Sequence, residues 1–148
     1  MKTVGLHRLR SWYREWRLGP LPPLPYRARL CQGTAWRKAF PTVPKEEVRY
    51  FLEVFVRAFA FRSSSRLNFA PDDSILAIYR TLYASRWTPD SLEVESFAKQ
   101  MEHRYRIDFA KVWHDGLTLG EVFGVAQLAR VGAHDVEPFA PSDGFAAR

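Results

Sequence analysis

The segment KEEVRYFLEVFVRAF, residues 45–59, decides the fold class. Its apolar residues follow the i, i+3, i+4, i+7, i+8, i+11 spacing of one helix face: Val48, Phe51, Leu52, Phe55, Val56 and Phe59. Pro44 precedes the segment, and two glutamates lie in its first turn, which is typical of a helix N-terminus. The pattern predicts an amphipathic helix that begins at Lys45 and ends near Arg62.

Three more segments have helical periodicity, at residues 74–84, 88–107 and 118–130. The last begins with a capping box, in which Glu121 reaches back to the amide of Thr118. No segment of useful length alternates with the period of a strand. The sequence therefore predicts an all-α domain, a small bundle of three or four helices, over residues 45–130.

Residues 1–44 differ from this domain and are predicted to form a basic, Pro-rich arm. Residues 5–18 have the pattern of a short amphipathic helix, and the Pro-rich segment from Gly19 to Pro25 is expected to be extended. The arm can pack back on the domain through its Trp and Leu residues. Residues 131–148 are aperiodic and are predicted to be a flexible tail.

The positive charge is concentrated at the N-terminal end of the chain. Residues 1–65 contain 13 Lys and Arg against 4 Asp and Glu, whereas residues 66–148 contain 9 against 12. The amphipathic segment in residues 1–18 could pack on its own domain or on a protein, or bind an anionic membrane through Trp12 and Trp16. Nucleic acid is a less favoured partner, because no recognisable binding motif accompanies the charge.

The cysteine content and the N-terminal sequence indicate the cellular compartment in which the protein is expected. Cys31 is the only cysteine, so no disulfide can form within the chain. Arg8, Arg10, Arg14 and Arg17 interrupt any apolar run near the N-terminus, which excludes the pattern of a signal peptide. A cytoplasmic protein is expected.

The segment from Asp90 to Asp108 resembles the second helix of acyl carrier proteins. That family has an Asp-Ser-Leu triplet at the start of this helix, and here the triplet is Asp90-Ser91-Leu92. The similarity continues without a gap through a run of residues of matching type: Glu93, Phe97, Met101, Glu102, Tyr105, Ile107 and Asp108. The segment 117–122 resembles the start of the family's last helix.

The resemblance implies a carrier function. Ser91 would hold 4′-phosphopantetheine, and Asp90 would help a pantetheinyl transferase to engage the serine. Leu92, with Glu93 and Glu95 on the same helix, would contact partner enzymes such as an acyl-loading enzyme. The protein would shuttle an acyl or aminoacyl group and catalyse nothing itself.

Two other interpretations of the same residues remain open. Asp90 and Glu93 also fit an ordinary capping box, which needs no prosthetic group. The chain also departs from the family pattern, because Trp87-Thr88-Pro89 replaces the usual lead-in to the serine and Lys99, Arg104 and Arg106 reduce the acidity of the helix. The alternative function is a carrier-fold module, without a prosthetic group, that binds another protein.

The remaining polar residues do not form a catalytic or metal-binding pattern. The histidines His7, His103, His114 and His134 are scattered, with no i, i+4 pair and no cysteine nearby to complete a metal site. His114, Asp115 and Ser91 could in principle form a hydrolytic triad, but the Gly-x-Ser-x-Gly elbow is missing. We therefore expect neither a metal site nor an enzyme.

Overall fold

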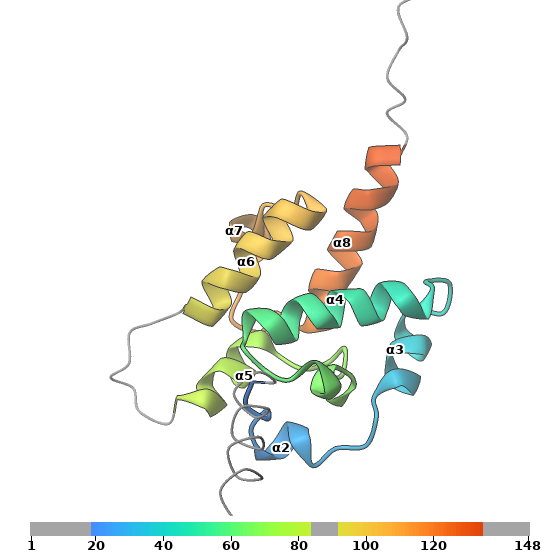
Figure 1. Cartoon of the computed structure of the whole chain (residues 1–148). Coiled ribbons are helices and arrows are strands. Elements are labelled where there is room, and N and C mark those ends of the chain that lie inside the picture. The colour runs from blue at the N-terminus through green and yellow to red at the C-terminus, as the bar shows by residue number, and fades with distance from the viewer. Residues whose placement is uncertain (1–18, 84–91, 135–148) are drawn as a thin grey trace, which may run out of the picture.

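The computed structural model describes residues 19–83 and 92–134, and in these ranges the protein is built from helices and contains no strand. The elements follow in the order α2 (Leu24–Arg27), α3 (Gly33–Ala39), α4 (Lys45–Ala58), η1 (Ser63–Asn68), α5 (Ile75–Leu82), α6 (Leu92–Tyr105), α7 (Phe109–Val112) and α8 (Leu119–His134). Helices α6, α7 and α8 lie on one side of α4, and α2, η1 and α5 lie on the other (Figure 1). The all-α prediction is confirmed for this part of the chain.

The long helix α4 begins at Lys45, as its sequence predicts, and ends earlier than expected. Five of the six residues of its predicted apolar face are buried within the helix, and the sixth, Phe59, is buried at its C-cap. The helix ends in a Schellman motif, in which Phe61 N–H donates to Val56 O at 2.7 Å and Ala60 N–H donates to Arg57 O at 3.0 Å. Ala60 adopts the left-handed conformation that this motif requires, with φ of 58°.

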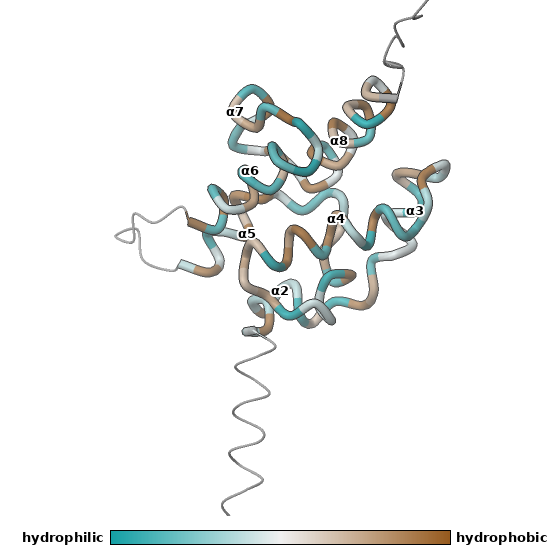
Figure 2. The backbone as a smooth tube through the Cα atoms, turned by 45° about the horizontal axis from the view of Figure 1, so that its top comes forward, coloured by the Kyte–Doolittle hydropathy of each residue, from teal (hydrophilic) through white to brown (hydrophobic). Residues whose placement is uncertain are grey.

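Phe51 of α4 lies at the centre of the aromatic core and is fully buried. Its ring centroid is 6.1 Å from Trp36 of α3, 6.0 Å from Phe97 of α6 and 5.1 Å from Phe123 of α8. Such ring pairs contribute to stability beyond the area that they bury. Helix α4 therefore holds α3, α6 and α8 together, and its apolar residues lie in the middle of the molecule (Figure 2).

Part of the segment assigned to the arm is packed into this core. Tyr26 of α2 and Trp36 of α3 are both buried, and the indole N–H of Trp36 donates to Phe69 O at 2.8 Å. Residues 19–44 thus pack back on the domain through a Trp, whereas the leucines of this segment are exposed: Leu21, Leu24 and Leu30. The predicted amphipathic helix in residues 5–18 lies outside the described residues.

The prediction that the Pro-rich segment is extended as far as Pro25 is wrong. Helix α2 begins at Leu24 and contains Pro25 in its first turn, with Pro23 as an extended N-cap. The amides of Tyr26 and Arg27 both donate to Pro23 O, at 3.0 and 3.1 Å. Proline is tolerated here because the first amides of a helix have no partner within the helix.

The turn before α5 is tied to the start of α8. The amide of Ile75 donates to Leu117 O, and the amide of Leu119 donates to Asp73 O, both at 3.0 Å. The carboxylate of Asp73 accepts from the guanidinium of Arg29 at 2.7 and 2.8 Å, which links this turn to the segment between α2 and α3. The predicted capping box is confirmed, because Thr118 N–H donates to Glu121 Oε2 at 2.8 Å.

The structure differs from the sequence prediction in three further places. The segments expected to be loops after α4 and α6 contain the 3₁₀ helix η1 and the short helix α7. Helix α3 occupies a segment in which periodicity is weak. Helix α8 continues to His134, four residues beyond its expected end, so the first residues of the segment predicted to be a tail are helical.

The close approach of α8 to the turn before α5 requires a glycine. A Cβ atom at Gly120 would lie 2.9 Å from both Cβ and O of Pro71, whereas one at Gly132 would meet no atom within 4 Å. We expect Gly120→Ala to lower the free energy of unfolding by about 1 to 3 kcal/mol because Pro71 must move. The matched change Gly132→Ala should raise it by up to about 1 kcal/mol, since alanine favours the helix. Urea unfolding measures both, and equal effects of the two changes would contradict this account of Gly120.

The contribution of α3 to the core gives a second prediction. Trp36 is 1% exposed and contacts Phe51 and Phe123, whereas Leu30 is 86% exposed. Trp36→Ala should lower the free energy of unfolding by about 3 to 5 kcal/mol because it leaves a cavity in the core. Leu30→Ala should change it by less than about 0.5 kcal/mol. A Trp36→Ala protein with wild-type stability would show that α3 is not part of the folded core.

Candidate functional site

The candidate site lies at the start of α6. Ser91, to which the resemblance assigns the prosthetic group, and Asp90, which would help the transferase to engage it, lie outside the described residues. The first residue of α6 is Leu92, which directly follows Ser91 in the chain, and its side chain is 61% exposed. An exposed leucine at this position leaves an apolar side chain in contact with solvent beside the predicted attachment point.

The two acidic residues predicted to contact partners lie in different environments. Glu95 is exposed, whereas Glu93 is half-buried. Oε1 of Glu93 accepts a hydrogen bond from the hydroxyl of Tyr83, which follows the last residue of α5. Oε2 of Glu93 is buried, and none of the described residues donates to it. Glu93 therefore attaches the start of α6 to the end of α5.

The apolar face of α6 fixes this helix on the core. Phe97, Met101 and Tyr105 are buried. The ring of Phe97 is 5.4 Å from that of Phe55 in α4 and 5.8 Å from that of Phe109 in α7. A helix packed on two neighbours through large aromatic residues is a rigid base for whatever its first turn displays.

The exposed face of α6 has charges of both signs. Glu95, Lys99 and Glu102 are exposed along the helix. Arg104 near its end donates to Gln100 Oε1 at 2.9 Å and to the hydroxyl of Tyr50, and its guanidinium carbon lies 5.6 Å from the centroid of the Tyr50 ring. The contacts of Glu93 with Tyr83 and of Arg104 with Tyr50 join α6 to other parts of the fold, and sequence reasoning missed both.

The loop before α8 contains the histidine considered for a triad. His114 Nε2 lies 3.5 Å from Glu121 Oε1, at the capping box of α8. Hydrogen bonds from Thr118, its backbone amide first, lower the pKa of Glu121, and the neighbouring His114 adds to this effect. Among the described residues, no group of three or more His, Cys, Asp and Glu side chains could hold a metal ion.

No family model, curated protein or solved structure matches the chain. Within the described ranges, no helix is both long enough and apolar enough to cross a membrane. The case for a function therefore depends on the residues of the chain and on their geometry.

Burial of Tyr105 near the end of α6 should lower the free energy of unfolding at alkaline pH. Burial raises the pKa of Tyr105 to about 12, and none of the described residues bonds to its hydroxyl. The unfolded chain loses this proton near pH 10, so unfolding releases a proton between pH 10 and 12 and stability falls as pH rises through that window.

We expect Tyr105→Phe to remove this alkaline loss, which is about 2 to 3 kcal/mol across the window. At pH 8 the variant should be as stable as the wild type, or slightly more stable, because a buried hydroxyl without a partner is removed. Urea unfolding at pH 8, 10 and 11 measures this, and about half of the loss should be present in the wild type at pH 11. The control Tyr79→Phe, at a half-buried tyrosine of α5, should keep the alkaline loss, and a Tyr105→Phe protein that also keeps it would refute the assignment to Tyr105.

Proposed function

We propose that the protein is an acyl carrier-like protein that displays a 4′-phosphopantetheine arm on Ser91 and carries an acyl or aminoacyl group between enzymes. The observation that carries the proposal is that the Asp90-Ser91-Leu92 triplet directly precedes the body of α6, a helix of 14 residues whose first residue is exposed. In this proposal α4, α6, α7 and α8 are the four helices of an acyl-carrier-type bundle, and α6 is the helix that follows the modified serine.

The chemistry of a helix N-terminus supports this position for the prosthetic group. A phosphodiester on Ser91 would lie beside the backbone amides of the first turn of α6, which have no partner within the helix. The helix dipole also favours negative charge at this end. Glu93 and Glu95 follow in the first turn, where acidic residues suit the same dipole.

The packing of α6 supports the mechanical role of a carrier. A swinging arm delivers its cargo reproducibly only if its attachment point is held in place. The core contacts of Phe97 hold the middle of α6, and the hydrogen bond from Tyr83 to Glu93 holds its first turn. Leu92, which follows Ser91 in the chain, and Glu95 are exposed, and in this proposal a pantetheinyl transferase and an acyl-loading enzyme contact this part of the helix.

A second function is favoured by the charge on α6. Because Glu93 is engaged with Tyr83 and Lys99 is exposed, the outer face of α6 is less acidic than the resemblance implies. The alternative is a protein-binding module of the same fold that has no prosthetic group. In either case residues 1–18 could attach the protein to an anionic membrane surface.

Intact mass after co-expression with a broad-specificity pantetheinyl transferase tests the carrier function. We expect a gain of about 340 Da, the mass of the added phosphopantetheine group. Ser91→Ala should abolish the gain, because the attachment oxygen is removed. The matched change Ser96→Ala, at a half-buried serine of the same helix, should retain the gain.

The control for the transferase is a known carrier protein expressed in parallel. If that carrier is modified and this chain is not, the carrier function is refuted, and the protein-binding module is favoured. If Ser91→Ala is still modified, the attachment point is a different residue.

A further inference from the structure

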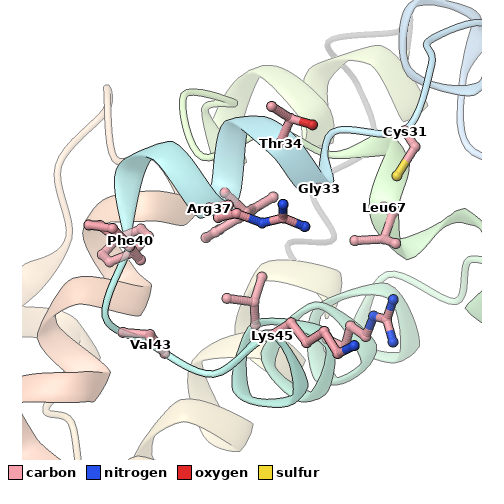
Figure 3. Close-up of a pocket in the computed structure, with 12 residues that line it drawn as sticks. Cys31, Gly33, Thr34, Arg37, Phe40, Val43, Lys45 and Leu67 are labelled. Atoms are coloured by element: carbon pink, nitrogen blue, oxygen red, sulfur yellow. The ribbon is translucent and has the colours of Figure 1, made fainter.

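A pocket of about 480 Å³ lies between α3 and the start of α4 (Figure 3). Helix α3 forms one wall and α4 the other. The connection that contains Phe40 and Val43 closes one end, and Cys31 and Leu67 lie at the other (Figure 3). This volume is in the range of pockets that hold small organic molecules.

Apolar side chains line the interior of the pocket, and the core holds them in place. Five of the lining residues are large apolar groups: Trp36, Phe40, Val43, Val48 and Leu67. The indole N–H is the only polar group of the Trp36 side chain, and it already donates a hydrogen bond to Phe69 O. The amide of Gln32 donates to Leu67 O at 2.7 Å, which ties the start of α3 to η1. The pocket is therefore formed by fixed elements before any ligand binds.

The charged groups of the pocket are all positive. Arg37, Lys45 and Arg49 line it, and no carboxylate occurs among the described residues that do so. Neither Arg37 nor Arg49 forms an ion pair with an acidic residue of the described ranges, and Lys45 has only a 3.9 Å contact with the exposed Glu46. The sequence accounts for this charge, because it contains no Asp or Glu between Glu15 and Glu46.

We propose that this pocket binds an amphiphilic anion, a small molecule with an apolar chain or ring and one terminal carboxylate or phosphate. The apolar interior would receive the apolar part, since its burial is favourable. The guanidinium groups of Arg37 and Arg49 would bind the anionic group, because hydrogen bonds between ionised groups are stronger than hydrogen bonds between neutral groups. A neutral or cationic molecule of the same shape would gain only the first of these contributions.

This site is separate from the start of α6. Helices α4 and α6 are antiparallel, because Phe55 contacts Phe97 whereas Phe51, one turn earlier in α4, contacts Tyr105. The start of α6 therefore lies toward the C-terminal end of α4, and the pocket lies at the N-terminal end (Figure 1). The proposal does not depend on modification of Ser91.

Cys31 provides the test, because it is the only cysteine of the chain, is exposed and lines the pocket. The rate of its alkylation by iodoacetamide, a neutral reagent, is measured on the full chain with and without decanoate below its micelle-forming concentration. Decanoate should slow the reaction severalfold. Decanol and decyltrimethylammonium at the same concentration should slow it much less. Decyl phosphate, measured in parallel, shows which anionic group the pocket prefers.

A pair of charge variants tests the role of the arginines. Arg37→Gln with Arg49→Gln should raise the decanoate concentration for half-protection about fivefold to tenfold, as expected for loss of two partly exposed ion pairs. The matched pair Arg57→Gln with Arg80→Gln removes the same charge from exposed positions that do not line the pocket, and it should change this concentration little. Each variant is compared with itself without decanoate, so a change in the basal reactivity of Cys31 cancels.

Three results would overturn the proposal: no protection of Cys31 by decanoate or decyl phosphate, equal protection by decanol, or equal effects of the two variant pairs. The first two comparisons use the wild-type protein, so they stand even if a variant folds poorly. Ser91→Ala should retain full protection by decanoate. Loss of protection in that variant would show that the two sites are not separate.

Discussion

The packing of Phe51 determines how the rest of the structure is arranged. Its ring contacts Trp36, Phe97, Tyr105 and Phe123, with centroid separations between 5.1 and 6.4 Å. Through these contacts one residue of α4 joins α3, α6 and α8. A small domain has few buried residues with which to offset the entropy of folding, so large aromatic groups that each contact several elements supply much of its stability.

Two surfaces of different character follow from this arrangement. Because α6 runs antiparallel to α4, its first turn lies at the end of α4 opposite to the pocket. The start of α6 displays the exposed residues Leu92 and Glu95, and the predicted carrier serine directly precedes this helix in the chain. The pocket combines an apolar interior with three basic groups. The same core fixes both, so a ligand at one end need not disturb the other.

Polar contacts connect segments of the chain outside the aromatic core. The ion pair of Arg29 with Asp73 joins the segment before α3 to the turn before α5, and backbone hydrogen bonds join that turn to the start of α8. Asp73 is buried, and the guanidinium of Arg29 and the amide of Ala70 donate hydrogen bonds to its carboxylate. Backbone hydrogen bonds from Leu119 and Gly120 hold the start of α8 against the turn, and the absence of a side chain at Gly120 makes the close approach to Pro71 possible.

Features that depend on residues close together in the chain could be predicted from the sequence. The period of apolar residues located α4, α5, α6 and α8, and the i, i+3 spacing of Thr118 and Glu121 identified a capping box that the structure contains. The assignment of Asp90 and Ser91 to a carrier site stays a prediction. The structure was needed to find where α4 ends, because Ala60 adopts a left-handed conformation that alanine does not favour. It also decided that Trp36 belongs to the core, that Glu93 bonds to Tyr83, and that the basic groups of α3 and α4 share a pocket. Each of the last three features depends on contacts between different elements of the fold, and the pattern within one segment carries no information about which other element will pack against it.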